Sequence, residues 1–207
     1  MRTQVLVLAK APVPGRVKTR LCPPCTPEQA AAVAYAAIED TLDAVDATSA
    51  RWRTLVADGV MTARPGWCLV PQRDGDLGVR IASAFTAAAE EAEATLLIGM
   101  DTPQVRPDLL DAAVRAADEA DAALGLAEDG GWWALTLRDP AHATLIQEIP
   151  TSRPDTGRRT LAALRAYGLR VAELPVLRDV DTAADAVEVA RRCPDGRFAA
   201  AVTECLG

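Results

Sequence analysis

The stretch V-L-V-L-A-K-A-P-V-P-G-R-V-K-T-R-L, residues 5–21, decides the fold of this 207-residue chain. Its first five residues form a continuous apolar run, which is typical of a strand buried on both faces. Two prolines and a glycine then end the strand and impose a loop. The loop contains no acid, although the whole chain carries a net charge of −7. It contains four cations: Lys10, Arg16, Lys18 and Arg20.

This local excess of positive charge at a strand end predicts a phosphate-binding loop, because open α/β sheets bind ligands at the carboxyl ends of their strands. The loop lacks both the G-x-x-x-x-G-K-[ST] and the G-x-G-x-x-G spacing. Its cations would therefore supply the attraction that backbone N–H groups supply in those motifs. The alternative is a solvated basic turn. The predicted phosphate contacts are Lys10, Gly15, Arg16, Lys18 and Arg20.

Apolar runs and helical patterns alternate along the rest of the chain, which predicts an α/β protein with a doubly wound, largely parallel sheet. Strands are expected over 5–9, 53–57, 67–70, 95–99, 122–126, 132–137 and 169–174. Helices are expected over 26–46, 78–93, 107–119 and 156–167, with further helices after 182. The short turn at Glu128 joins two strands directly, so part of the sheet should be antiparallel. No repeat or linker interrupts residues 1–207, and we expect one domain.

Composition narrows the classes of partner. Half of the residues are apolar and a quarter are charged, and the pI is near 4.8. Such an acidic chain is a poor match for nucleic-acid polymers or an anionic membrane. No apolar run approaches the ~20 residues that span a bilayer, and no signal-peptide pattern opens the sequence. We expect a cytoplasmic protein that acts on small molecules, and the sequence does not indicate its oligomeric state.

Five cysteines are present, and we expect them to act as small apolar side chains. Cys22-Pro23-Pro24-Cys25 has C-x-x-C spacing, which could form half of a zinc site or a redox pair. A second pair of ligands is missing, because His142 is the only histidine and the other cysteines are isolated. The apolar interpretation is favoured. Because His142 is the only histidine and has no evident partners, the sequence does not indicate a catalytic triad with a serine or cysteine nucleophile.

Two groups of carboxylates follow predicted strands. Asp101 ends the strand over 95–99, and Asp179 and Asp181 follow the strand over 169–174. In a doubly wound sheet these acids lie on the same edge as the basic loop. Carboxylates beside phosphate-binding cations suggest Mg²⁺, which binds one or two carboxylates together with phosphate oxygens and water. The alternatives are structural, since acids also cap helices and form turns.

Two further loops could contact a ligand. The segment E-D-G-G-W-W, residues 128–133, combines an acid, two residues without side chains and a large ring. It could be an acceptor site or only a hairpin turn that precedes a core strand. The predicted acceptor contacts are Asp129, Gly130, Gly131 and Trp132. The loop G-D-L-G, residues 75–78, could present backbone groups to a nucleotide base through Gly75, Leu77 and Gly78.

Taken together, these motifs resemble a known family. The set A-K-x-P-x-P-G-x-V-K-T-R-L, G-D-L-G-x-R, G-x-D-T-P, A-E-D-G-G-W and D-V-D-T-x-x-D is similar to small bacterial GT-A-like transferases, which are grouped with the nucleotide-diphospho-sugar transferases. A more distant likeness is to the phospholactate guanylyltransferases. The resemblance implies a Rossmann-like, three-layer GT-A fold with a mostly parallel, mixed central sheet. It also implies a nucleotide in the cleft and Mg²⁺ (or Mn²⁺) bound by Asp101 and Asp181, with phosphate contacts from Lys10, Lys18 and Arg20.

The expected function is transfer from a nucleotide donor to a small, phosphorylated acceptor. Four loop cations suit the roughly four negative charges of a nucleoside triphosphate better than the roughly two of a nucleotide sugar. Nucleotidyl transfer with release of pyrophosphate is therefore favoured, with Lys18, Arg20 and Asp101 as the predicted catalytic residues. The alternatives are glycosyl transfer from a nucleotide sugar and a non-catalytic regulator that only binds nucleotide.

Overall fold

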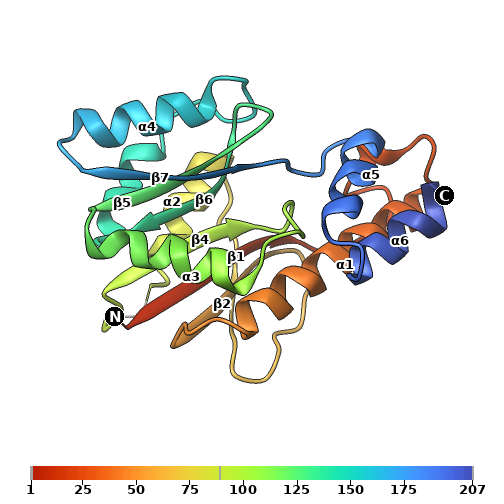
Figure 1. The fold of residues 1–207 in the computed structure, drawn as a ribbon, viewed down its shortest axis with the longest axis horizontal. Helices are drawn as coiled ribbons and strands as arrows, with labels where there is room; N and C mark the ends of the chain where they lie inside the picture. Colours follow the sequence, from red (N-terminus) through yellow and green to blue (C-terminus); the bar gives the residue numbers. More distant parts are fainter. Residues whose placement is uncertain (1, 89, 207) are drawn as a thin grey trace.

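The structure, a computed structural model, describes residues 2–88 and 90–206 and contains a seven-stranded sheet in the order β3-β2-β1-β4-β6-β5-β7 (Figure 1). The strands are β1 (Thr3–Lys10), β2 (Trp52–Asp58), β3 (Cys68–Pro71), β4 (Ala94–Gly99), β5 (Ala122–Ala127), β6 (Trp132–Leu137) and β7 (Val171–Leu177). The α-helices are α1 (Pro27–Asp46), α2 (Leu77–Phe85), α3 (Pro107–Arg115), α4 (Thr156–Ala166), α5 (Ala183–Arg192) and α6 (Arg197–Leu206). The short 3₁₀ helices are η1 (Thr19–Leu21), η2 (Ala116–Asp118) and η3 (Pro140–Ile146).

The strand directions match the mixed sheet that the sequence predicts. Strand β1 pairs in parallel with β2 and β4, and β5 pairs in parallel with β7. Only β6, among the described strands, runs against both of its neighbours, because the tight turn after β5 reverses the chain. The chain order also reverses at β1, with β2 on one side and β4 on the other. Such a switch point leaves a crevice outside the carboxyl ends of the strands.

Alternate side chains of the central strands enter two different apolar clusters, as the two-residue period of a strand requires. Val5 and Val7 of β1 pack with α1 and α3 on one face of the sheet. Leu6 packs on the other face with α2, η3 and α4. All three of these β1 side chains are inaccessible to solvent. The continuous apolar run of the sequence therefore reflects helices on both faces, which form the three layers of the fold.

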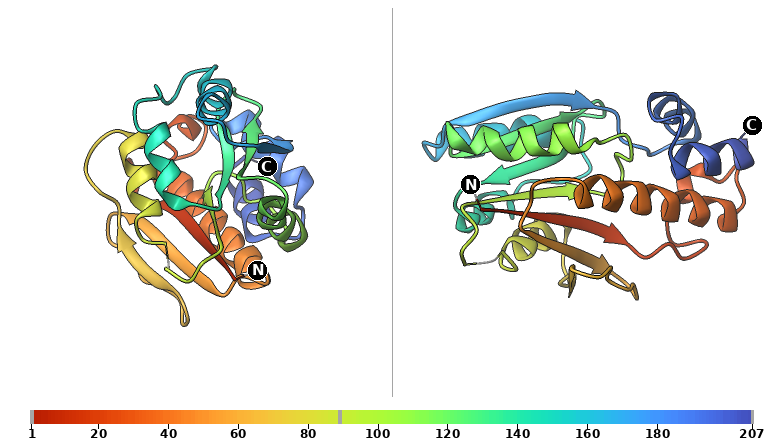
Figure 2. Two further views of the ribbon diagram at one scale, coloured as in Figure 1. Left: turned by 90° about the vertical axis from the view of Figure 1, so that its left-hand side faces the viewer. Right: turned by 60° about the horizontal axis from the view of Figure 1, so that its bottom comes forward.

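A third apolar cluster lies beyond the sheet. Helix α1 has 20 residues and extends past the strands toward α5 and α6 (Figure 2). Its first turn is fixed by a capping box between Thr26 and Gln29, as the sequence predicts. Leu21, Val180 and Phe198 are buried between these helices. Because Val180 stands between Asp179 and Asp181, this cluster anchors the segment that carries both acids.

The boundaries of several elements differ from the sequence prediction. Helix α2 ends at Phe85 and is followed by turns instead of continuing to Glu93, and residue 89 of that predicted helix lies outside the described residues. Helix α3 ends at Arg115 and continues as η2. Strand β7 lies two to three residues further along the chain than predicted, since it is an exposed edge strand with alternating burial and lacks a clear apolar run.

The cysteines also differ from the prediction. Cys25 forms a disulfide with Cys205, across 180 residues of sequence and with their Cα atoms 5.7 Å apart. Cys22, Cys68 and Cys193 are free. The pairing arises because α6 packs on the start of α1, a contact without a local sequence signal. Among the described residues, no helix is long and apolar enough to cross a membrane.

Candidate active site

A pocket of about 470 Å³ opens at the carboxyl ends of the strands, beside the switch point of the sheet. This volume is within the usual range for small-molecule sites. One part of the pocket wall is apolar and includes Leu8, Leu77 and Ile81. The other part is polar and includes four carboxylates, Asp101, Asp129, Asp179 and Asp181. The division suits a ligand that has one apolar ring and one strongly charged group.

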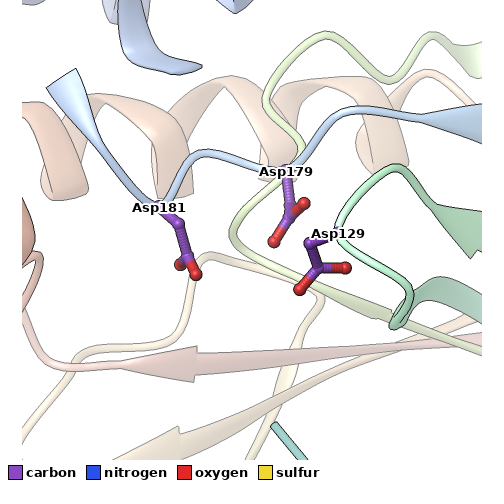
Figure 3. Close-up of side chains that lie close together, drawn as sticks. All are labelled: Asp129, Asp179 and Asp181. Atoms are coloured by element: carbon purple, nitrogen blue, oxygen red, sulfur yellow. The ribbon is translucent and has the colours of Figure 1, made fainter. Parts of the chain in front are cut away.

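Three of these carboxylates converge. Oxygen atoms of Asp129, Asp179 and Asp181 lie within 4.8 Å of one another. Asp179 and Asp181 come from the segment after β7, and Asp129 comes from the turn after β5 (Figure 3). Oxygens bound to one Mg²⁺ at about 2.1 Å lie at most about 4.2 Å apart. The three side chains therefore fit one divalent cation after small shifts, and an all-oxygen set is what Mg²⁺ and Mn²⁺ prefer.

Lys18 holds the fourth carboxylate and the acidic segment, residues 178–181, in place. Its ammonium donates to the carboxylate of Asp101 and to the carbonyl oxygen of Val180. Val180 in turn donates its N–H to the carbonyl oxygen of Asp101 at 2.8 Å. The Lys18 side chain is only 7% exposed, and its backbone is left-handed with φ 47°. Such a conformation costs a non-glycine residue energy and marks a position fixed by its surroundings.

Asp179 has the most perturbed acidity in the site. Burial, followed by the negative charges of Asp129, Asp181 and Asp101, raises the pKa of Asp179 to about 6. A group of like charges in a partly buried position favours the neutral form. A divalent cation between these carboxylates would reverse the preference. The electrostatics of the site therefore agree with the cation that its geometry accommodates.

The basic loop divides into two parts. Arg20 lines the pocket, and its guanidinium donates to Asp181 at 3.0 Å while 70% of the side chain stays exposed. Lys10, Gly15 and Arg16 are exposed and lie outside the pocket lining. Of the five predicted phosphate contacts, the structure thus brings only Arg20 to the pocket surface and Lys18 directly behind it.

The predicted base-binding loop has a mixed placement. Leu77 lines the pocket. Gly78 is buried under η3, where an added Cβ would lie 2.7 Å from the carbonyl oxygen of Gln147. Gly75 has φ +125° and accepts a hydrogen bond from the Arg80 guanidinium at 2.8 Å. Gly75 and Gly78 therefore shape the loop, and Leu77 is the member that can touch a ligand.

The predicted acceptor residues lie where the turn after β5 meets a second loop. Asp129, Gly131 and Trp132 line the pocket. Gly130 instead packs against the chain at Pro154, and a Cβ there would come within 2.0 Å of the Pro154 carbonyl oxygen. The absence of a side chain at Gly130 is thus required by loop packing.

The chain is similar to a known protein family and to several solved structures. Residues 29–153, more than half of the chain, match the family model described as "Uncharacterized protein conserved in bacteria (DUF2064)". The chain belongs to the DUF2064 family. No curated protein matches it significantly.

Solved structures place this DUF2064 chain in the nucleotide-diphospho-sugar transferase fold, as the sequence predicts. A proposed nucleotide-diphospho-sugar transferase from Desulfovibrio desulfuricans G20 is 25% identical, with a TM-score of 0.88 over 99% of this chain and 95% of that one. Rv0371c from Mycobacterium tuberculosis H37Rv, in complex with manganese, is 18% identical, with a TM-score of 0.58 over 92% and 99%. A CMP:2-keto-3-deoxy-manno-octonic acid synthetase in complex with CTP is 13% identical, with a TM-score of 0.58 over 94% and 98%.

The structure groups the acids of the pocket differently from the sequence prediction. The prediction paired Asp101 with Asp181 as metal ligands and gave Asp129 to the acceptor. The structure brings Asp181 together with Asp129 and Asp179, whereas Asp101 pairs with Lys18. The D-x-D spacing of residues 179–181 was a usable signal, because alternate residues of an extended segment face the same side. The position of Asp129 beside them had no such signal, since it depends on the pairing of β5 with β7.

Proposed function

We propose that this protein is a divalent-metal-dependent nucleotidyltransferase. The observation that carries the proposal is the convergence of Asp129, Asp179 and Asp181 in one pocket with the exposed guanidinium of Arg20. Three carboxylates suit Mg²⁺ or Mn²⁺, and the metal, when bound, would neutralise phosphate charge. Proteins of this fold hold ligands of these classes, since one is in complex with CTP and another with manganese.

In the proposed reaction, an acceptor oxygen forms a bond to the α-phosphorus of a nucleoside triphosphate. The bond from that phosphorus to the β-phosphate oxygen breaks, and pyrophosphate leaves with its electron pair. A hydroxyl acceptor loses its proton to solvent, and a phosphate acceptor has none to lose. Arg20 binds phosphate oxygens through its fork of N–H donors. Lys18 holds Asp101 and the acidic segment in position relative to each other. The apolar wall beside Leu77 covers the base.

Glycosyl transfer is the second candidate, favoured by the relative from Desulfovibrio desulfuricans G20, which is a proposed nucleotide-diphospho-sugar transferase. The two reactions release different products. A nucleotidyltransferase liberates pyrophosphate, whereas a glycosyltransferase liberates a nucleoside diphosphate and moves the sugar.

The test has two stages. The first measures thermal stabilisation by the four nucleoside triphosphates and by common nucleotide sugars, with Mg²⁺, Mn²⁺ or EDTA. A ligand at a hundred times its Kd should add about 2.7 kcal/mol of stability. The second stage identifies the product released from each stabilising donor with pooled hydroxylated and phosphorylated acceptors. Pyrophosphate supports the proposal, and nucleoside diphosphate supports the second candidate.

Two variants make the test specific. Asp179→Asn should abolish metal-dependent stabilisation, because it removes a ligand charge at nearly constant shape. The matched control is Glu119→Gln, an exposed acid that follows η2 at the opposite edge of the sheet. Stabilisation that survives EDTA and Asp179→Asn would contradict a metal site. Binding without any product would make the protein a nucleotide-binding regulator.

A further inference from the structure

Two arginines reach the pocket from different elements. Arg20 belongs to the basic loop and contacts Asp181. Arg153 belongs to residues 150–156, the end of the connection from η3 together with the first residue of α4; Pro154 of this loop packs on Gly130, next to Asp129. Asp129 and Asp181 are two of the three clustered carboxylates. The two arginines therefore line the pocket that holds the carboxylate cluster, and they come from two separate segments of the chain.

The charge of Arg153 is poorly compensated. Its nearest acid is Asp155, at 3.6 Å, and 59% of the Arg153 side chain is exposed. Asp155 makes a better contact with Arg159, whose guanidinium donates to it at 2.7 Å. The Arg153 guanidinium makes no hydrogen bond within residues 2–88 and 90–206. Apart from the long ion pair with Asp155 through its Nε, the guanidinium has its N–H donors available to a ligand in the pocket.

Two hydroxyl groups stand beside this arginine. Thr151 and Ser152 line the same pocket, and their hydroxyls have no hydrogen-bond partner in the described parts of the chain. Ser152 has φ 57°, a left-handed conformation that is unfavourable for a residue with a Cβ and that its surroundings must hold in place.

The shape of this loop is imposed by its packing. The Thr156 hydroxyl accepts from the Arg153 N–H at 3.2 Å and donates to the Pro150 carbonyl oxygen at 2.9 Å. Gly157 donates its N–H to the Gly130 carbonyl oxygen at 2.8 Å. Loop 150–156 is therefore held at both of its ends, and its three polar side chains, Thr151, Ser152 and Arg153, are presented at the pocket.

We propose that Arg153, with Thr151 and Ser152, binds a phosphate group of the acceptor. The inference rests on the proposed function, which places the donor at Arg20 and the metal at the carboxylate cluster. A phosphate has three terminal oxygens, so it can use the guanidinium fork and both hydroxyls. A carboxylate offers one oxygen fewer and about half of the negative charge, so it matches this group of donors less well. The substrate class is therefore a phosphorylated small molecule.

The test titrates inorganic phosphate against the full chain by calorimetry, in saturating Mg²⁺, with and without the donor nucleotide. Arg153→Gln should weaken phosphate binding about tenfold or more, in line with the loss of a charge-assisted hydrogen bond. Arg153→Lys should recover part of the affinity, since it keeps the charge but lacks the fork. Arg20→Gln should instead weaken the nucleotide and leave the phosphate titration of nucleotide-loaded protein unchanged.

Arg158→Gln is the matched control, because Arg158 is exposed, lies five residues further on and is outside the pocket lining. If Arg153→Gln and Arg158→Gln lose the same phosphate affinity, the effect comes from the change in net charge alone, and the proposal is overturned. Unchanged phosphate binding in Arg153→Gln, or equally tight binding of acetate in its place, would also overturn it. If no nucleotide binds, the proposed function fails, while the nucleotide-free titration still decides whether Arg153 binds phosphate.

Discussion

Lys18 is the residue on which the geometry of the site depends most directly. It is almost inaccessible to solvent and satisfies two acceptors from different parts of the chain, Asp101 and Val180. In the structure Lys18, which the sequence predicts to bind the donor phosphates, therefore holds two segments of the pocket together. Val180 is buried among the helices beyond the sheet, while its neighbours Asp179 and Asp181 line the pocket. One ammonium group thus links the basic loop, the end of β4 and the proposed metal ligands.

The first prediction concerns this link. Lys18→Met should lower the free energy of unfolding by about 1–3 kcal/mol, because it leaves the carbonyl of Val180 without a donor and Asp101 without its partner. Chemical denaturation measures the change. Lys10→Met is the control, since Lys10 is exposed and should stay within about 0.5 kcal/mol of the wild type. Equal stability of both variants would contradict the positioning role.

The second prediction concerns Asp179 and pH in metal-free protein. Burial, followed by the charges of its neighbours, raises the pKa of Asp179 from an ordinary 3.8 to about 6. Between these values the folded chain keeps a proton that the unfolded chain has lost. The stabilisation contributed by this proton is complete below about pH 4 and is lost as the pH rises through 6. Asp179→Asn mimics the neutral form, so it should melt above the wild type at pH 7.5 and together with it near pH 4.

Thermal melting in EDTA at the two pH values measures this difference. Asp74→Asn, at an exposed aspartate, is the control. Its melting temperature should differ from that of the wild type by the same amount at both pH values. Added Mg²⁺ should stabilise the wild type at pH 7.5 and leave Asp179→Asn unaffected. A variant that melts below the wild type at pH 7.5 in EDTA would contradict the electrostatic account of the cluster.

At the scale of elements, the site is an assembly of strand ends and two loops that pack on each other. The turn after β5 and loop 150–156 meet where Gly130 passes under Pro154. Gly130 needs glycine for two separate reasons, its φ of +91° and the 2.0 Å approach that a Cβ would make to the Pro154 carbonyl oxygen. Gly168 shares only the first reason, because it has φ +93° and no atom near an added Cβ.

The third prediction uses this pair of glycines. Gly168→Ala should cost about 1–2 kcal/mol, the price of a left-handed conformation for a residue with a Cβ. Gly130→Ala should cost about 1–3 kcal/mol more, because a clash with the backbone forces the loops apart. Chemical denaturation gives both values. Gly130→Ala should also weaken phosphate binding, whereas Gly168→Ala should not. Equal costs would show that the two loops do not pack as described.

At the scale of the whole molecule, local patterns predicted the sheet but not the assembly of the site. The apolar runs of β1 and β4 are buried on both faces, so their burial is visible in the sequence. The edge strand β7 lacks such a run, and its predicted limits were displaced. The convergence of Asp129 with Asp179 depends on which strands lie side by side. No local pattern encodes that order, which is why the sequence prediction placed Asp129 with the acceptor contacts and did not group it with Asp179 and Asp181.

The disulfide is a second feature that no local sequence pattern predicts, because its two cysteines lie 180 residues apart. Helices α5 and α6 pack on the part of α1 that extends beyond the sheet, and they form with it the cluster that buries Val180. Cys25, just before α1, is joined to Cys205 in α6. The disulfide therefore links the start of α1 to α6, within the apolar cluster that also buries Val180 of the acidic segment. A cross-link between distant residues stabilises mainly by restricting the unfolded chain, typically by 2–4 kcal/mol.

The last prediction follows from this pairing. Protein denatured without reductant should titrate three thiols, those of Cys22, Cys68 and Cys193, and five after reduction. In the native state Cys68 should react first, since it is exposed, whereas burial raises the pKa of Cys193 to about 11 and leaves little thiolate. Replacing Cys25 and Cys205 by serine should lower the melting temperature, and Cys68→Ser should leave it unchanged. Five thiols before reduction would show that α6 is held by its apolar contacts alone, and the double variant should then melt close to the wild type.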